Sequence, residues 1–197
     1  YFPLNELNTY RKLNSRLQGH PTTHEHLPGI RIASGSLGQG MSVAIGAALS
    51  KKMNGDVQTV FSLHGDGELD EGQNWEAIMF AAGNNVDNLI STVDRNGQQI
   101  DGTTEHVMKL GVVGEKFKVF GWDVLVTDGN DLDELLSTFK KAKKKLGKGK
   151  PVAIIMNTVM GKGVDIMEGK HEWHGIAPNE DQLKLALAQL DSPLEDF

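Results

Sequence analysis

Short apolar runs alternate with longer stretches of mixed polarity along most of the chain. The runs with the length and apolar content of strands lie at residues 57–63, 89–94, 122–127 and 152–159. The stretches with helical character lie at residues 4–17, 41–53, 75–82, 114–120, 131–146 and 179–190. The run at 152–159 is almost continuously apolar, which is typical of a strand buried on both faces of a sheet. This alternation predicts an α/β fold, in which a parallel sheet is flanked by helices on both faces.

Local signals mark where some of these helices begin and end. Gly147 follows the helix predicted at 131–146 and is expected to end it. Asn179 precedes Gln182 by three residues, which is a capping-box pattern for the start of the last helix. Residues 20–40 are rich in His, Pro and Gly, which predicts a long loop. Ligands of α/β folds bind at the carboxyl ends of the strands, so the loops after strands are the places to search for chemistry.

The composition excludes several classes of protein. With 197 residues, the chain is long enough for one globular domain with its own core. There is no Cys, which excludes disulfides, thiolate metal sites and Cys nucleophiles. A net charge of −6 argues against nucleic acid as a partner, and no apolar stretch approaches the length of a membrane span. We therefore expect a cytoplasmic protein that binds neither nucleic acid nor a membrane.

The two ends of the chain suggest a part of something larger. The sequence begins without Met and without a first strand, so we expect that its natural start is missing. Near the other end, Asp191-Ser192-Pro193 is typical of a stop or a linker. Two interpretations, a piece of a longer chain and a natural subunit, remain open at this point.

Two polar, glycine-containing loops follow predicted strands. In the first, Gly65 and Gly67 flank Asp66, whose carboxylate could bind a hard cation while nearby backbone amides face a phosphate. In the second, Asn96 offers an amide oxygen, and the backbone beyond it could turn a carbonyl inward. The carboxyl ends of parallel strands share one edge of a sheet, so the two loops should meet there. An Asp, an Asn and a carbonyl form an oxygen-only set that suits octahedral magnesium, although a plain turn would also explain the first loop alone.

These loops resemble those of the thiamine-diphosphate enzymes, which share a GDG motif followed further along by an Asn. Within that superfamily the chain resembles transketolases over nearly its whole length. The matching motifs, in the family's order, are Gly19-His20-Pro21, Gly35-Ser36-Leu37-Gly38-Gln39-Gly40, Gly65-Asp66-Gly67-Glu68-Leu69-Asp70-Glu71-Gly72, Asn96-Gly97, Ile100-Asp101-Gly102, Gly161-Lys162-Gly163 and Trp173-His174-Gly175. The resemblance implies the diphosphate-binding domain of the thiamine-diphosphate fold, spanning 1–197 as a single domain. The pyrimidine-binding and C-terminal domains of that family have no counterpart here.

The resemblance also implies a cofactor site. Mg²⁺, with Ca²⁺ or Mn²⁺ as substitutes, would be bound by the side chains of Asp66 and Asn96 and by the carbonyl of Gln98. Thiamine diphosphate would lie against Gly65 and Gly67, with the Gly67 amide contacting the diphosphate. Asn96 and His174 would also lie beside the cofactor. Gly35 and Leu37 match a loop that packs along it.

Three residues match positions that act in the family's chemistry. His20 and His174 would line the substrate channel near the reactive carbon. Glu71 would belong to the hydrogen-bond network that joins the two active sites of a dimer. The implied reaction is the reversible transfer of two-carbon ketol units from ketose to aldose phosphates, as in the pentose phosphate pathway. The implied partner is a chain or domain with the pyrimidine-binding and C-terminal parts, in a homodimer or heterotetramer.

Simpler interpretations exist for several of these residues. His20 could only shape a loop, and Glu71 could only favour the start of the helix that follows it. His24-Glu25-His26 lacks further ligands with suitable spacing, and we interpret it as a solvated loop. His171-Glu172-Trp173-His174 is not the HExxH zinc motif, because its histidines are three residues apart. We expect His64 to be structural, and the lysines at 140–145 to form a solvated, helix-terminal face.

Other functions remain open beside transketolase. One is another thiamine-diphosphate enzyme, such as a 1-deoxyxylulose-5-phosphate synthase or the first component of pyruvate dehydrogenase. A second is a cofactor-binding module that is inactive alone. A third, a nucleotide-binding or regulatory α/β domain, requires the GDG and Asn motifs to be coincidental.

Overall fold

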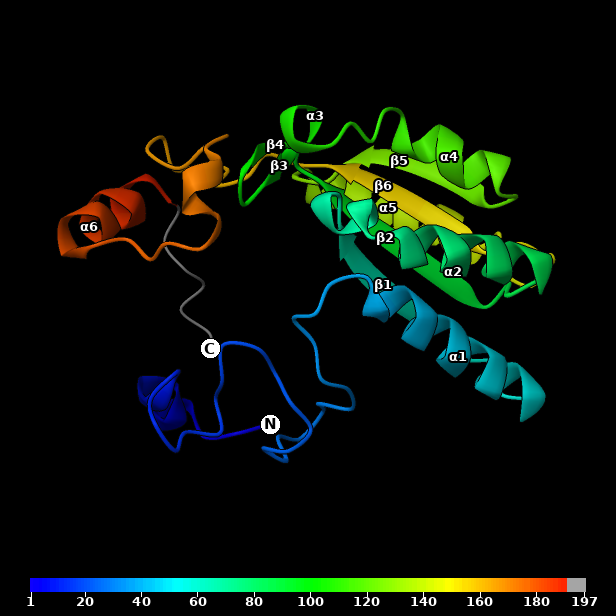
Figure 1. Ribbon diagram of the computed structural model, residues 1–197, viewed down its shortest axis with the longest axis horizontal. Coiled ribbons are helices and arrows are strands. Elements are labelled where there is room, and N and C mark those ends of the chain that lie inside the picture. Colours follow the sequence, from blue (N-terminus) through cyan, green and yellow to red (C-terminus); the bar gives the residue numbers. More distant parts are fainter. Residues whose placement is uncertain (191–197) are drawn as a thin grey trace.

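A four-stranded parallel sheet forms the centre of the protein, as shown in Figure 1 by the computed structural model, which describes residues 1–190. The strands lie in the order β1, β2, β6 and β5 across the sheet. Their bounds are β1 Val60–Gly65, β2 Leu89–Arg95, β5 Asp123–Asp128 and β6 Val152–Asn157. Each overlaps a predicted strand, so the predicted parallel sheet is confirmed. Residues 191–193, the predicted stop or linker, lie outside the described residues.

Helices connect the strands and cover the sheet. The α-helices are α1 Gln39–Met53, α2 Gly72–Gly83, α3 Thr104–Val107, α4 Val113–Val119, α5 Leu132–Lys143 and α6 Glu180–Gln189. The 3₁₀-helices are η1 Leu4–Thr9, η2 Gly67–Asp70 and η3 His171–His174. The predicted capping box is present at Asn179 and Gln182 of α6, and Gly147 adopts φ +71° beyond the end of α5. No helix in the described part of the chain is long and apolar enough to cross a bilayer.

The two faces of the sheet pack against different helices. On one face, Ala153 and Ile155 of β6 join a core with buried residues of α1, α2 and α4. On the other face, Val152 and Ile154 of the same strand pack with Ala142 at the end of α5. This alternation along β6 follows from the two-residue period of a strand and explains the continuous apolar run. The prediction of helices on both faces is therefore confirmed.

A small hairpin that was not predicted follows β2. It consists of β3 (Gln98–Gln99) and β4 (Gly102–Thr103), which pair antiparallel and form a separate two-stranded sheet. Strands of two residues have too little pattern to be recognised from sequence. The hairpin lies at the carboxyl edge of the main sheet, directly after Asn96 (Figure 1).

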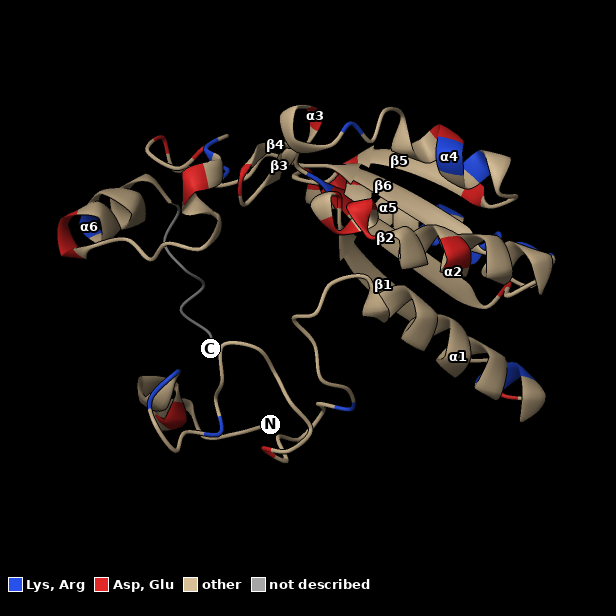
Figure 2. Cartoon of the chain, in the orientation of Figure 1, with Lys and Arg blue, Asp and Glu red and all other residues tan. Residues whose placement is uncertain are grey.

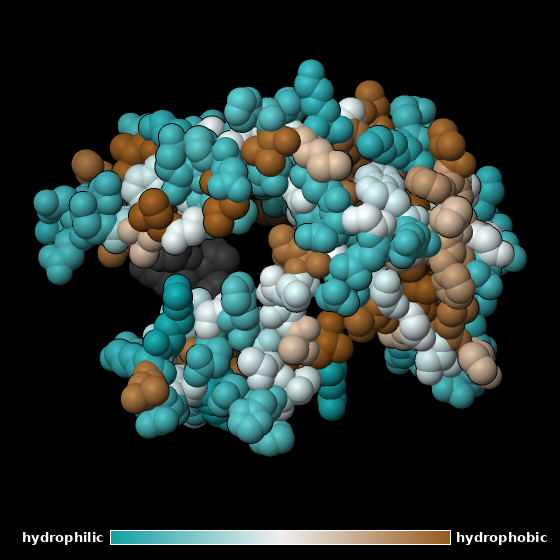
Figure 3. Space-filling model, in the orientation of Figure 1, coloured by the Kyte–Doolittle hydropathy of each residue, from teal (hydrophilic) through white to brown (hydrophobic). Residues whose placement is uncertain are grey.

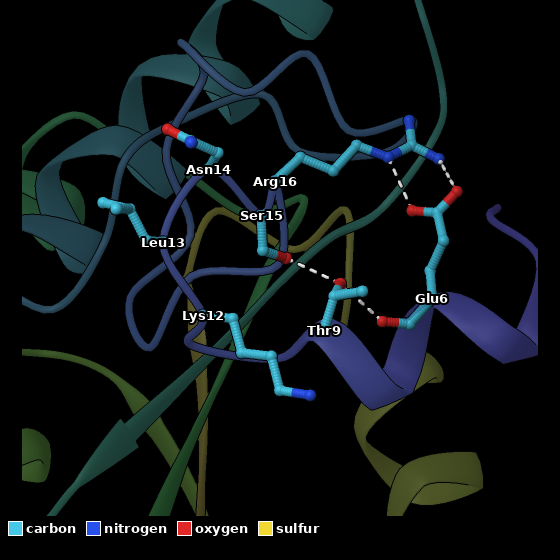
Figure 4. Close-up of a pocket in the computed structure, with 7 residues that line it drawn as sticks. All are labelled: Glu6, Thr9, Lys12, Leu13, Asn14, Ser15 and Arg16. Atoms are coloured by element: carbon cyan, nitrogen blue, oxygen red, sulfur yellow. Dashed lines mark hydrogen bonds and ion pairs between the residues drawn. The ribbon is translucent and has the colours of Figure 1, made fainter.

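The predicted helix at 4–17 is wrong. Only η1 forms, and the chain then turns back on itself through Arg11 and Asn14, whose φ angles are +57° and +62°. Glu6 pairs with Arg16 through two hydrogen bonds of 2.7 and 2.8 Å (Figure 4). Thr9 and Ser15 are joined by a third hydrogen bond of 2.8 Å, which closes the reversal. None of the residues of η1 is buried, so a helix here would have had no apolar packing to stabilise it.

Candidate functional site

Asp66 lies at the centre of the carboxyl edge of the sheet. Asp66 directly follows β1 and is 2% exposed. Its Oδ1 accepts a hydrogen bond of 2.8 Å from the Gly67 amide, and its Oδ2 accepts one of 2.7 Å from the Gly97 amide. One carboxylate thus joins the loop after β1 to the loop after β2. The parallel register of the two strands, which places Gly65 opposite Asp94, makes this contact possible.

The surroundings of Asp66 favour a bound cation. Burial raises the pKa of Asp66, and the nearby charge of Asp94 raises it further, while the amides of Gly97 and Gly67 partly offset both effects. A buried carboxylate with a raised pKa is stabilised when a cation lies beside it, because the cation compensates for lost hydration. Figure 2 marks acidic positions in red along the ribbon just before α2, where the chain leaves the end of β1.

Asn96 and Gln98 lie in the second loop beside Asp66. The Asn96 side chain is half-buried, and its Oδ1 accepts a hydrogen bond of 2.9 Å from the Gln98 amide. Among residues 1–190 there is no group of three or more His, Cys, Asp or Glu that could bind a metal. The candidate ligands are instead one carboxylate, one amide oxygen and a backbone carbonyl. Such a set suits Mg²⁺, which keeps several positions for phosphate oxygens and water, so these residues fit the metal.

The two glycines of the first loop have different surroundings. A Cβ on Gly67 would lie 2.9 Å from the Cβ of Gln99, so the hairpin approaches this backbone too closely for a side chain. The Gly65 amide donates a 3.2 Å hydrogen bond to Oε2 of Glu68. A contact of either glycine with diphosphate remains a prediction.

The structure brings His20 and Gly35 together. Gly35 adopts φ +111°, and a Cβ at this position would lie 2.6 Å from the His20 ring. Leu37 is 55% exposed and lines a cleft of about 710 Å³ with Gly35, His64 and Glu68. Residues 1–33, blue in Figure 1, extend away from the sheet, and within the described chain no hydrogen bond joins His20 to the Asp66 loop.

His174 lies in a segment that contacts the β3–β4 hairpin. It is the last residue of η3 and is exposed. The helix η3 contacts both β3 and β4, so the fold places the segment of His174 next to the loop of Asn96 and Gln98. Trp173 fixes this segment by donating a 2.8 Å hydrogen bond from its indole nitrogen to the Ile166 carbonyl.

Glu71 lies at the junction of two motifs. It is the N-cap residue of α2 but makes no capping hydrogen bond with its side chain, and it is exposed. A Cβ on Gly38 would lie 2.8 Å from the Cβ of Glu71, so the turn before α1 packs against the start of α2. Its family role in a network between two active sites stays a prediction.

Sequence patterns did not reveal two interacting residues of this region, Glu68 and Gln99. Glu68 accepts a hydrogen bond of 2.9 Å from the Gly38 amide, 30 residues away. The Gln99 side chain donates a 3.3 Å hydrogen bond to Asp70. The signal for Glu68 was a second acid within the glycine-flanked loop, but its partner lies too far along the chain to be inferred. His64, expected to be structural, is 1% exposed.

A family model described as "Transketolase, thiamine diphosphate binding domain" matches residues 1–194. The chain belongs to the transketolase family. This match agrees with the resemblance seen in the sequence motifs, and it assigns the chain to the thiamine-diphosphate-binding domain. The glycine-flanked Asp66 and the Asn96 loop are part of the matched region.

Two curated relatives are subunits of transketolases. The chain is 41% identical over 191 residues to the 6-deoxy-6-sulfo-D-fructose transketolase subunit SqwG of Clostridium sp. (strain MSTE9), covering 97% of this chain and 68% of the relative. It is 38% identical over 190 residues to an apulose-4-phosphate transketolase subunit of Actinobacillus succinogenes, covering 96% and 67%. The chain thus spans about two thirds of the length of these relatives.

Solved structures show the same fold. The transketolase of Campylobacter jejuni superposes with a TM-score of 0.86 and 34% sequence identity, over 94% of this chain and 30% of that chain. The transketolase of Leishmania mexicana superposes with a TM-score of 0.85 and 27% identity, over 94% and 29%. The sheet and helices described above are therefore those of the transketolase family, although the chain spans under a third of these proteins.

Proposed function

We propose that this chain is the N-terminal, diphosphate-binding part of a transketolase that transfers two-carbon ketol units from ketose to aldose phosphates. The observation that supports this most directly is the buried Asp66, whose carboxylate joins the two loops that contain the metal motif. The names of two relatives, both transketolase subunits, favour a protein that works with a second chain. The alternative of one longer chain that also contains the pyrimidine-binding and C-terminal domains requires the same site.

In the proposed site, Asp66, Asn96 and the Gln98 carbonyl bind Mg²⁺, which Ca²⁺ or Mn²⁺ could replace. The metal would compensate the charge of the diphosphate, and the Gly67 amide, which donates to Asp66 in the structure, would also contact it, while Gly35 and Leu37 would pack along the cofactor. Thiamine diphosphate supplies the nucleophilic carbon and the electron sink for this reaction class. The chain itself contributes binding, orientation and proton transfer.

His20 and His174 are the proposed groups near the reacting carbon. Both are exposed, so their imidazoles are accessible to a substrate. Imidazoles titrate near neutral pH and can donate or accept protons from the substrate hydroxyls. We propose that His174 transfers protons and that His20 binds the terminal hydroxyl of the donor ketose.

The partner is proposed to cover apolar surface on α1 and α2. Val43, Met79 and Phe80 are 42%, 57% and 50% exposed on these helices. Figure 3 shows hydrophobic residues, in brown and tan, over the part of the molecule where α1 and α2 lie. Contiguous exposed apolar surface is typical of an interaction site. We propose that the pyrimidine-binding part, or a second copy in a dimer, packs there, and that Glu71 links the two active sites across that interface.

Two other thiamine-diphosphate enzymes share this reaction's first step. A 1-deoxyxylulose-5-phosphate synthase or the first component of pyruvate dehydrogenase would use the same metal site but a 2-oxo acid in place of a donor ketose. The family match and the transketolase relatives favour ketol transfer. Supplying the assembled enzyme with a ketose phosphate or with pyruvate distinguishes these reactions.

Calorimetry on Asp66→Ala tests the proposed site. Thiamine diphosphate titrated in magnesium buffer should bind at least about 100-fold more weakly to the variant, because loss of even an indirect ligand contact costs 10- to 100-fold. Asp128→Ala is a matched control, since Asp128 also ends a strand at this edge of the sheet but is exposed. Equal affinity of Asp66→Ala and the unmodified protein would refute the metal assignment.

A second experiment tests the need for a partner. Residues 1–194 match the thiamine-diphosphate-binding domain, and we propose that a second chain or domain supplies the pyrimidine-binding part, so the 197-residue chain alone should show no ketol transfer. Activity should appear when a cognate chain with that domain is added. Turnover by the purified chain alone would contradict this part of the proposal.

A further inference from the structure

The carboxylate of Glu68 lies between two segments that are far apart in the sequence. Its Oε1 accepts a 2.9 Å hydrogen bond from the Gly38 amide, and its Oε2 accepts one of 3.2 Å from the Gly65 amide. Gly38 ends the segment of Gly35 and Leu37, whereas Gly65 begins the loop of Asp66. Among the described residues, the hydrogen bond from the Gly38 amide to Glu68 is the one that joins residues 35–38 to the loop after β1.

His64, which lies in β1, contacts this carboxylate. It is 1% exposed, and its Nδ1 lies 3.4 Å from Oε2 of Glu68. Its Nε2 lies 3.0 Å from the Ser62 hydroxyl, which in turn donates a 3.1 Å hydrogen bond to Ser91 of the next strand. A line of polar contacts thus runs from the sheet interior to Glu68, so the position of the carboxylate is determined by the core.

The Glu68 carboxylate is held in one place. Its side chain is only 11% exposed. Each of its two oxygens accepts a hydrogen bond from a different backbone amide, Oε1 from Gly38 and Oε2 from Gly65, so the carboxylate connects the two segments directly.

The turn that Glu68 binds has little freedom to move toward the helix α2. Gly38 adopts φ +83°, and a Cβ there would lie 2.8 Å from both Glu71 and Gln73. The Glu68 backbone is fixed as well, because its carbonyl accepts a 2.7 Å hydrogen bond from the buried side chain of Asn74. The Gly38 turn and the Glu68 backbone are therefore each held by contacts of their own, besides the hydrogen bond between them.

We propose that Glu68 is a positioning residue for thiamine diphosphate, whose carboxylate fixes the Gly35–Leu37 segment relative to the loop of Asp66 and Gly67. In this proposal Glu68 acts through the backbone amides of Gly38 and Gly65. This inference rests on the proposed function, since it requires both segments to lie against the same ligand. Without Glu68, the segment 35–38 keeps its sequence but loses its connection to the diphosphate loop.

The length of the side chain provides the test. Glu68→Asp keeps the charge but withdraws the carboxylate by one methylene, so it cannot reach both amides. Glu68→Gln keeps the reach and one oxygen acceptor. In the natural full-length protein with its partner chain, where it has one, we expect thiamine diphosphate at saturating Mg²⁺ to bind about 10-fold more weakly to Glu68→Asp, and within about threefold of normal to Glu68→Gln.

Calorimetry gives these affinities, and circular dichroism at the same temperature shows that each variant is folded. Glu115→Ala, which removes an exposed acid from α4, is the control and should bind normally. Normal affinity in folded Glu68→Asp would overturn the inference, and so would equal losses in Glu68→Asp and Glu68→Gln. Failure of the unmodified protein to bind thiamine diphosphate would instead overturn the proposed function.

Discussion

Two regions of the candidate site differ in how firmly this chain holds them. One is the sheet edge around Asp66, and the other consists of the segments that contain His20 and His174. Asp66 is buried and hydrogen-bonded to two backbone amides at the ends of neighbouring strands. The two histidines are exposed, and their segments lie beyond the layers of the central sheet (Figure 1). The protein thus preorganises the proposed metal and diphosphate end of the site. We propose that the end near the reacting carbon is completed by the partner chain or domain.

Hydrogen exchange should reveal this difference with the largest effect. In the isolated chain without cofactor, amides of 152–157 should exchange only through global unfolding, whereas those of 20–37 and 160–178 should exchange through local opening. With a global stability of about 5 kcal/mol or more, the rates should differ by at least about 10³-fold. Mass spectrometry of peptides from the three segments measures this ratio. Similar, slow exchange in all three would contradict the comparison.

Replacing His174 tests the histidine end alone. In the assembled enzyme, His174→Ala should lower turnover by about 10²–10⁴-fold, which is typical for the loss of a general acid or base. Binding of Mg²⁺ and thiamine diphosphate should persist, because the Asp66 edge is unchanged.

His24→Ala is the control for that experiment, since His24 is an exposed histidine of the N-terminal loop, and it should leave turnover unchanged. Loss of cofactor affinity in His174→Ala, with normal turnover at saturating cofactor, would assign His174 to diphosphate binding instead.

Asn96→Ala tests the metal end with a smaller effect. One neutral ligand is lost and the Gln98 amide loses its acceptor, so cofactor affinity in magnesium buffer should fall about 10-fold. Asn130→Ala is a matched control, because Asn130 follows β5 and accepts a 2.8 Å hydrogen bond from the Val159 amide. If both variants bind equally well, Asn96 only shapes the loop and does not bind the metal.

The smallest effect concerns the stability of the fold at low pH. Asp87 lies 2.7 Å from the Lys52 ammonium and accepts a 2.9 Å hydrogen bond from the Gly149 amide. Burial raises its pKa, but the Lys52 and Gly149 contacts outweigh burial, so the pKa of Asp87 is lowered. A carboxyl with a lowered folded-state pKa stabilises the fold above its unfolded pKa and loses this contribution as pH falls through the folded value.

Asp87→Asn should therefore lower the free energy of unfolding by about 1 kcal/mol at pH 7, and by less at pH 3. Urea unfolding at both pH values measures the two differences. An equal loss at pH 3 and pH 7 would show that the charge of Asp87 is not the source of the stabilisation.

Much of the fold was predictable because the core is locally encoded. The apolar run of β6 and the capping box of α6 depend on neighbouring residues, and both lie where they were predicted. The helix at 4–17 failed because helical character without a buried face does not maintain a helix. The hairpin β3–β4 was missed because its strands have two residues each.

For the candidate site, the order of strands and loops along the chain is enough to place Asp66 and Asn96 at one edge of a parallel sheet. Only tertiary packing shows that the Asp66 carboxylate binds the Gly97 amide, and that Glu68 binds Gly38 from 30 residues away. The physical reason is that strand and loop propensities depend on residues that are neighbours in the sequence, so they do not report contacts between distant segments. A hydrogen bond of 2.7 Å between distant segments exists only after the sheet has brought those segments together.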